Sequence, residues 1–173
     1  AKKFGYPVFN ADEEVSKLYK KNKKIFLKFK KILPKFFHSF PINKKEILKA
    51  ILDDDNNLKK IVKIVHLEIR KKMNFFLKKH KNKKIVILDI PLLLENKINK
   101  KNYILIFIQS KKFDILKKIR NRENYNKIIL NKFRKIQLPL AYKRNKSQFI
   151  IKNNFTSQSV KKDIQYILNR IQK

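Results

Sequence analysis

The chain has 173 residues, 46 of them Lys or Arg and 13 of them Asp or Glu, which gives a formal net charge of +33. This length predicts one domain that buries a sizeable core. The absence of Cys excludes disulfides and thiolate zinc sites, and no apolar run is long enough to span a membrane. The single glycine, Gly5, excludes a glycine-rich phosphate loop within these residues.

The high positive charge has two interpretations. A basic surface is typical of nucleic-acid-binding proteins. However, Lys is spread along the whole chain, Arg is scarce, and Lys, Asn and Ile dominate together, which is typical of an A/T-biased coding sequence. We therefore expect no specific nucleic-acid partner, and weak, salt-sensitive binding to polyanions. From the absence of Cys and of a membrane-spanning run we expect a cytoplasmic protein with no membrane partner. The oligomeric state does not follow from the sequence.

The first predicted elements are a short strand and a helix. Pro7–Phe9 is apolar, and Asn10 then stands where a helix N-cap accepts backbone hydrogen bonds, with an acidic residue three positions on. Val15–Leu33 has mostly helical spacing. Pro34 and Pro41 bracket a predicted irregular aromatic link at Lys35–Phe40.

The clearest predicted helix opens at the acidic cluster Asp53–Asp55. The acids lie where the positive end of the helix dipole favours negative charge. The apolar residues that follow recur with a period close to 3.6, which predicts one buried face: Leu58, Ile61, Val62, Val65, Ile69, Met73 and Phe76.

Three later apolar runs predict strands: Ile85–Ile90, Tyr103–Ile108 and Phe149–Ile151. The runs are continuous, which is typical of strands covered on both faces, as in a parallel sheet. Helices are predicted at Phe113–Arg122, Asn126–Ile136 and Ser159–Ile171. Strands that alternate with helices indicate an α/β fold with a parallel sheet.

Polar side chains follow three of the predicted strands. Asp12 follows the first strand, Asp89 follows the residues Ile85–Leu88 of the second, and Asn153 follows the last. Each one alone also fits a local role, as a first-turn helix acid, a cap or a turn residue. Because ligands bind beyond the carboxyl ends of the strands in open α/β sheets, the three together predict a ligand site at one sheet edge.

His66 and Arg70 are four residues apart and share a face of the predicted helix. Such a face offers an imidazole and a cation to an anionic ligand. Spacing alone favours a plainer interpretation, a surface His beside a core stripe with an Arg in solvent. No second His stands at metal-ligand spacing, so the sequence predicts no His-based metal site.

Basic residues between the later strands are candidates for phosphate contacts, since Arg offers a bidentate fork. In a chain this basic most of them are expected to be solvated, and helical periodicity cannot separate the two interpretations. The residues are Lys118, Arg120, Arg122, Lys143, Arg144 and Lys146.

In chain order, the segments FGYPVFNAD, IVHLEIR, LDIPLLLE, KKIRNRE, QLPLAYKR and FIIKNN together resemble dephospho-coenzyme A kinase. The resemblance runs along essentially the whole chain, and LDIPLLLE is its most specific segment. It implies a P-loop fold like that of the nucleoside monophosphate kinases, with a core at 1–14, 84–112 and 138–173, a helical coenzyme A-binding part at 15–83 and a lid at 113–137. The family's reaction transfers the γ-phosphate of ATP, with Mg²⁺, to the 3′-hydroxyl of dephospho-CoA.

The resemblance also implies roles for individual residues. Asp12 matches the family's base for the acceptor hydroxyl, and Asn153 matches a position near adenine. Implied substrate contacts are His66, Arg70, Pro91, Leu92, Leu93 and Glu95. Implied lid or phosphate contacts are Lys118, Arg122 and Arg144. No protein metal ligand is assigned.

The chain departs from the family pattern at four positions. Asn10 replaces Asp, Leu67 replaces Pro, Lys118 replaces Arg and Lys152 replaces Asp. A drifting A/T-rich lineage and a loss of activity both account for these changes.

The family's GxxxxGK[ST] loop and the strand before it are not among these residues. In the family this strand lies in the centre of the sheet, in the order 2-3-1-4-5. We therefore expect an inactive fragment with two unpaired strand edges, and about 10–20 further N-terminal residues in the complete protein. The alternatives are another small-molecule kinase of this fold, or a non-catalytic polyanion-binding protein.

Overall fold

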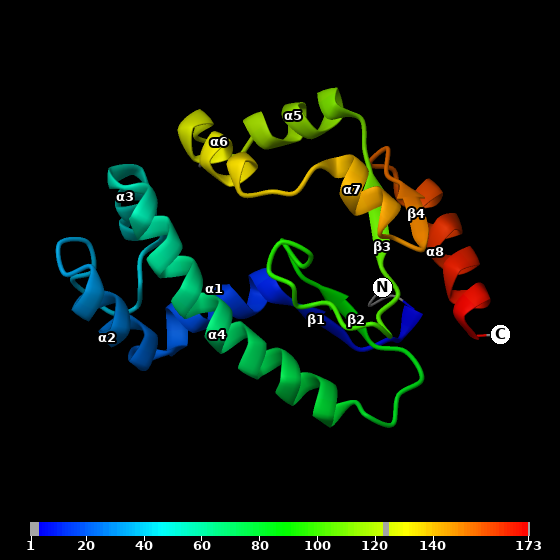
Figure 1. Cartoon of the computed structure of the whole chain (residues 1–173), viewed down its shortest axis with the longest axis horizontal. Coiled ribbons are helices and arrows are strands. Elements are labelled where there is room, and N and C mark those ends of the chain that lie inside the picture. The colour runs from blue at the N-terminus through cyan, green and yellow to red at the C-terminus, as the bar shows by residue number, and fades with distance from the viewer. Residues whose placement is uncertain (1–3, 123–124, 173) are drawn as a thin grey trace. The chain divides into compact units, whose positions relative to one another are not determined.

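The computed structural model of the chain describes residues 4–122 and 125–172 (Figure 1). Residues 1–3 of the predicted core, residues 123–124 of the predicted lid and residue 173 lie outside the described residues. The chain folds as two compact units, Ala1–Pro91 and Leu92–Lys173. In the described part of the chain, no helix combines the length and the apolar character that crossing a membrane requires.

Each unit contains a two-stranded parallel sheet, so the parallel pairing that the sequence predicts is confirmed. In the first unit, β1 (Val8–Asn10) pairs with β2 (Ile87–Asp89). In the second unit, β3 (Ile106–Gln109) pairs with β4 (Phe149–Lys152). Within the described residues each of these strands is therefore paired on one side only.

Four helices follow β1 in the first unit: α1 (Ala11–Lys21), α2 (Lys23–Ile32), α3 (Lys44–Asp53) and α4 (Asp55–Lys79). Each begins after an Asn or Asp whose side chain accepts a backbone N–H that the first turn leaves without a helical partner. These caps are Asn10, Asn22, Asn43 and Asp54. At α3, Glu46 also accepts from the cap's own N–H and completes a capping box.

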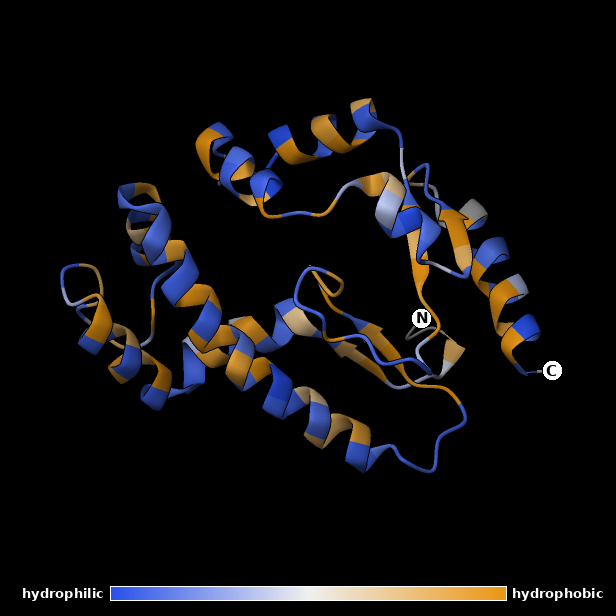
Figure 2. Ribbon diagram, in the orientation of Figure 1, coloured by the Kyte–Doolittle hydropathy of each residue, from blue (hydrophilic) through white to orange (hydrophobic). Residues whose placement is uncertain are grey.

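The core of the first unit lies between these helices. Figure 2 shows apolar and polar residues alternating along α4, as expected for a helix with one buried face. Phe29 and Phe37 are completely buried, and their ring centroids are 4.8 Å apart. The buried stripe of α4 consists of Leu58, Ile61, Val65, Ile69 and Met73, which confirms most of the predicted apolar face.

The second unit contains α5 (Lys112–Arg120), α6 (Lys127–Lys135), α7 (Leu140–Asn145) and α8 (Ser157–Gln172). Helix α8 packs on β4, where Ile151 and Ile167 are each 3% exposed. In contrast, α5, α6 and α7 contain no fully buried residue among those described. These three helices are therefore held by partial burial and by polar contacts.

The structure differs from the sequence predictions in the local division of the helices. The predicted helical segment Val15–Leu33 is divided at Asn22, which ends α1 and caps α2. The acidic cluster serves two helices, because Asp53 is the last residue of α3 and Asp54 caps α4. Helices α3 and α7 were not predicted. Helix α7 is only six residues long, whereas α3 offered two signals, a cap residue Asn43 with Glu46 three positions on and buried residues at helical spacing.

The predicted coverage of both sheet faces is not observed for β3. By the register of the sheet, Ile108 lies beside Ile151. Ile151 is buried under α8, whereas Ile106 and Ile108 are 41% and 53% exposed. The continuous apolar run correctly predicted a strand, but α8 covers β4 and leaves much of its neighbour exposed.

Candidate active site

The carboxyl ends of β1 and β2 bring together three polar side chains. Asn10 and Asp89 are paired in the sheet register. The Asn10 amide donates to a carboxylate oxygen of Asp89 at 2.9 Å, while its Oδ1 accepts the Glu13 backbone N–H at 2.9 Å. Asp12 lies in the first turn of α1 and is exposed. One amide thus fixes both the start of α1 and the carboxyl group at the end of β2.

Negative charge accumulates at this sheet edge. Partial burial raises the pKa of Asp89, and the charges of Asp12 and Glu13 raise it further. Asn10 limits this accumulation of negative charge. Its neutral amide donates a hydrogen bond to Asp89, whereas a carboxylate at position 10 would repel the Asp89 carboxylate. The replacement of Asp by Asn at position 10 therefore removes one charge from a crowded acidic edge.

His66 and Arg70 lie on one face of α4, as their spacing predicts. His66 is half-buried and Arg70 is exposed. Burial lowers the pKa of His66, and the nearby Arg70 charge lowers it further. At neutral pH this face therefore presents one permanent cation beside a neutral imidazole, which suits an anionic group with a hydrogen-bonding neighbour.

The segment that begins at Pro91 forms tight turns. Pro91 is exposed, and Leu92 has a positive φ of 55°. The Leu92 carbonyl accepts hydrogen bonds from both the backbone and the side-chain N–H groups of Asn96, at 3.0 and 2.8 Å. Leu93 is half-buried, and its carbonyl accepts the Ile98 N–H at 3.2 Å. These bonds fix the LDIPLLLE segment after it leaves β2.

Glu95 is the most constrained of the predicted site residues. Its side chain is 9% exposed, and its carboxylate lies 2.5 Å from the Lys143 ammonium. It also accepts the Leu138 N–H at 3.0 Å. Burial alone would raise the pKa of Glu95, but the hydrogen bonds from Lys143 and from backbone N–H groups outweigh it and hold the pKa below its usual value. Glu95 thus joins its own segment to the start of α7.

A shallow pocket of about 360 Å³ lies beside this ion pair, within the second unit. Leu94, Leu105 and Leu138 provide an apolar lining, and Lys97 and Lys146 add positive charge. The Lys146 ammonium lies 5.8 Å from the centre of the Tyr142 ring.

The predicted basic contacts of the second unit lie on separate elements. Lys118, on α5, has its ammonium 4.9 Å from the centre of the Phe155 ring, a cation–π contact. Arg122 follows α5 and is exposed, as is Arg144 on α7. Exposed Arg side chains are available to phosphate oxygens.

Asn153 lies directly after β4, where its backbone N–H donates to the Gln109 carbonyl at 2.7 Å. Its side-chain oxygen accepts the Phe155 N–H at 2.9 Å. The turn that the sequence predicts at this strand end is therefore present. Among the described residues, no group of three or more His, Cys, Asp or Glu side chains could hold a metal ion by itself.

Sequence reasoning missed the partners that hold these residues in place. Lys143 was identified only as one of several basic residues. Glu14 and Lys72, which join α1 to α4 at 2.9 Å, were not identified at all. The contact between Asn10 and Asp89 could have been predicted from the sequence, because each residue lies at the carboxyl end of a predicted strand and the two strands are neighbours.

Two solved structures share the fold. A dephospho-CoA kinase from Campylobacter jejuni has a TM-score of 0.63 and 21% identity, over 99% of this chain and 87% of that one. The protein TT1252 from Thermus thermophilus has a TM-score of 0.72 and 19% identity, over 98% and 86%. The chain thus shares the fold of these two proteins, and the predicted α/β fold class is confirmed.

The family follows from the sequence. The model of the family described as dephospho-CoA kinase matches residues 1–159. Relatives named dephospho-CoA kinase occur in Wolbachia sp. subsp. Brugia malayi (31% identical, over 98% of this chain and 88% of the relative) and in Wolbachia pipientis wMel (30%, over 97% and 87%). The chain belongs to the dephospho-CoA kinase family, and it is a kinase of coenzyme A biosynthesis.

Proposed function

We propose that the protein carries out the last step of coenzyme A synthesis, the transfer of the γ-phosphate of ATP to the 3′-hydroxyl of dephospho-CoA. The observation that carries the proposal is the family match over residues 1–159. Within that match, Asp12 stands at the carboxyl end of β1, the end of a parallel strand at which ligands bind in this fold class. A cytoplasmic location fits this chemistry.

In this proposal Asp12 accepts the proton of the 3′-hydroxyl as the oxygen attacks phosphorus. Phosphoryl transfer asks little of the protein beyond positioning, charge neutralisation and an acceptor for this proton. Asp12 is exposed and therefore open to a substrate. Asp89, held by Asn10, keeps the carboxyl end of β2 next to it.

The remaining predicted residues take binding roles. Arg70 provides a permanent cation for an anionic group of the acceptor, and His66 beside it provides a neutral hydrogen-bonding group. Pro91, Leu92 and Leu93 shape the acceptor side, and Glu95 holds that segment in place. Residues 15–83 form the coenzyme A-binding part, and residues 84–112 belong to the kinase core with 1–14 and 138–173.

We further propose that residues 113–137 form a lid that closes over the phosphates. Arg122 and Arg144 are exposed and able to contact phosphate oxygens, and Lys118 adds a third cation. The absence of fully buried residues in α5 and α6 fits an element that moves. Asn153 takes the position near adenine.

Mg²⁺ enters this proposal with the nucleotide. The ion usually keeps water molecules and substrate phosphate oxygens as ligands, and no protein ligand is assigned to it. When bound, Mg²⁺ neutralises charge on the phosphate oxygens. These residues do not include a glycine-rich phosphate-binding loop, since one glycine among 173 residues cannot form it. We propose that turnover requires that loop in addition to these residues.

A coupled ADP-release assay with ATP, Mg²⁺ and dephospho-CoA tests the proposal. It compares the 173-residue chain with an extended chain, in which a strand and a GxxxxGK[ST] loop precede Ala1. We expect turnover only in the extended chain, and its loss on Asp12→Asn. A folded extended chain that neither turns over nor binds dephospho-CoA by calorimetry would contradict the proposal.

Two further arms of the assay address other functions. A second small-molecule acceptor that outcompetes dephospho-CoA would indicate another kinase of the same fold. The net charge of +33 favours a polyanion-binding function as the other candidate. That function predicts a steeply salt-dependent, sequence-independent affinity for RNA or DNA in a chain without turnover.

A further inference from the structure

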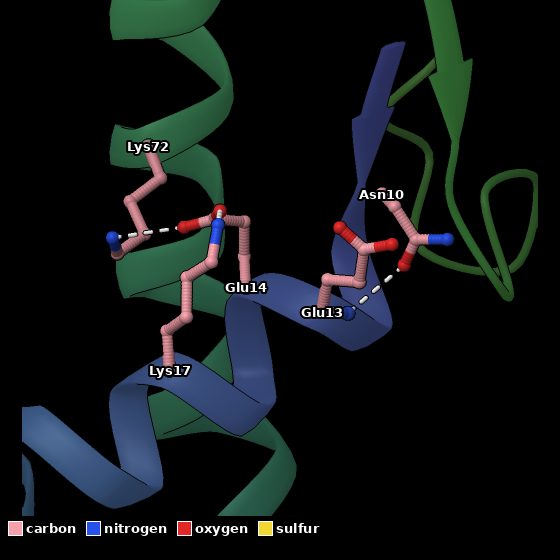
Figure 3. Close-up of polar contacts among 5 residues, drawn as sticks. All are labelled: Asn10, Glu13, Glu14, Lys17 and Lys72. Atoms are coloured by element: carbon pink, nitrogen blue, oxygen red, sulfur yellow. Dashed lines mark hydrogen bonds and ion pairs between the residues drawn. The ribbon is translucent and has the colours of Figure 1, made fainter. Parts of the chain in front are cut away.

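Helix α1 is joined to α4 by one carboxylate that contacts two ammonium groups (Figure 3). One Glu14 oxygen lies 2.6 Å from Lys17, one turn further along α1. The other lies 2.9 Å from Lys72 on α4. The two contacts differ in what they connect, because only the contact with Lys72 joins one helix to another.

The Glu14 carboxylate is held in its charged form. Its side chain is 18% exposed. Burial alone would raise the pKa of Glu14, but the hydrogen bonds from Lys17 and Lys72 outweigh it and hold the pKa below its usual value. The contact between the helices is therefore an ion pair across the neutral pH range.

The first turn of α1 is held at two places. Asn10 accepts the Glu13 backbone N–H and donates to Asp89, which attaches the start of the helix to the end of β2. Ala11 is buried in the same turn, and its methyl group is small. Glu14 is the long side chain that extends from this turn to α4.

The direction of Glu14 determines the direction of Asp12. Residues two apart on an α-helix point about 200° away from each other. With Glu14 turned toward α4, Asp12 points to the opposite side of α1. This direction fits the position of Asp12, which lies two residues after the end of β1, where Asn10 pairs with Asp89 at the end of β2.

We propose that Glu14 and Lys72 are positioning residues, whose ion pair fixes the rotation of α1 and thereby keeps Asp12 at the carboxyl ends of β1 and β2. The proposal rests on the proposed function in one respect, that Asp12 is the base. Neither residue touches the substrate. Their effect on the reaction is transmitted through the direction of Asp12.

The first test needs no catalysis. The pKa of the Asp89 carboxyl group is measured by NMR titration of the ¹³C-labelled 173-residue chain as wild type, Lys72→Met and Lys17→Met. Each variant removes one ammonium group from the same Glu14 carboxylate, so their charge changes match. Removing a positive charge by itself raises the pKa of nearby carboxyl groups. We expect the opposite in Lys72→Met, a fall toward the usual value, because Asp12 turns away from Asp89.

Lys17→Met should show no such fall, and Lys72→Arg should restore the wild-type value. Lys72→Gln, which keeps a polar side chain, provides a second variant if Lys72→Met does not fold by circular dichroism. A rise of the Asp89 pKa in both Lys72 variants, or equal shifts in Lys72→Met and Lys17→Met, would overturn the proposal.

The second test measures the reaction in the extended chain. Misplacement of a reacting group by about 1 Å can reduce a rate by about 100-fold. We expect Lys72→Met to lower kcat by about 10-fold or more, and to change the KM for dephospho-CoA by less than about twofold. Lys17→Met should retain kcat, and Lys72→Arg should recover most of it.

The outcomes separate this proposal from the proposed function. An extended chain that is inert in every form contradicts the proposed function, while the titration of Asp89 still decides whether the ion pair sets the rotation of α1. Turnover that is lost in Asp12→Asn but unchanged in Lys72→Met supports the proposed function and refutes the positioning role.

Discussion

Replacing Lys143 by Met removes the ammonium group that neutralises Glu95 and keeps most of the side chain's length. The Glu95 carboxylate is 9% exposed and Lys143 is 19% exposed, so little water replaces the lost partner. Removing one partner of a buried ion pair costs about 3–5 kcal/mol. The hydrogen bond from Leu138 remains, and the residual exposure of the site weakens the effect. We therefore expect the free energy of unfolding to fall by about 2–3 kcal/mol.

Urea unfolding of the 173-residue chain, followed by circular dichroism at pH 7, measures this change. Lys146→Met is the matched control, because it removes the same charge three residues away from an exposed side chain. Its effect should stay within about 0.5 kcal/mol. A difference of less than about 0.5 kcal/mol between the two variants would show that the Glu95 ion pair contributes nothing to stability.

The pH dependence provides an independent check. Because the folded pKa of Glu95 lies below its usual value of 4.5, the ion pair stabilises the folded state above that usual value. The stabilisation is lost as the pH falls through the folded pKa. Lys143→Met removes the largest of the effects that lower the pKa of Glu95, so the loss of stability as the pH falls below about 5 should be smaller than in the wild type.

Three further predictions follow from other contacts. Phe29 is completely buried, so Phe29→Ala should lower the free energy of unfolding by about 3–5 kcal/mol; a loss under 1 kcal/mol in urea unfolding would contradict the description of this core. Asn10→Asp keeps an acceptor for the cap of α1 but replaces the donor to Asp89 with a like charge, and should cost about 1–2 kcal/mol at pH 7. The cost should shrink at pH 4 as the carboxyl groups bind protons, and an equal cost at both pH values would refute the electrostatic explanation. By NMR, His66 should titrate below its usual pKa of 6.5; Arg70→Gln should raise this pKa only part of the way, since burial is the larger cause, and complete recovery would show that charge dominates.

Local features were predictable because they depend on neighbours in sequence. A cap side chain reaches backbone N–H groups two or three residues ahead, so Asn10 was identified as the start of α1 from its own segment. The buried stripe of α4 follows from helical geometry alone. The prediction of one helical segment at Val15–Leu33 missed a boundary. Helical spacing continues on both sides of Asn22, so the pattern did not reveal the end of α1 and the start of α2.

The family was indicated by the resemblance of motif segments and not by hydrophobic periodicity. The order of the six motif segments indicated the family, and the family match over residues 1–159 confirmed it. The roles of Asp12, Arg70 and Asn153 remain predictions, since family membership does not show how an individual side chain acts.

The sequence by itself determined the cap of α1, the apolar face of α4, the positions of the strands and the family, because each is encoded within a few consecutive residues or in an ordered set of motifs. Only the tertiary structure decided which charges meet. Glu14 contacts Lys72, which lies 58 residues away in the sequence. Glu95 forms its ion pair with Lys143, one of 46 Lys and Arg residues in the chain. In a chain with so many cations, composition cannot identify the partner of a carboxylate, because an ion pair forms only where packing brings the two groups together and excludes water.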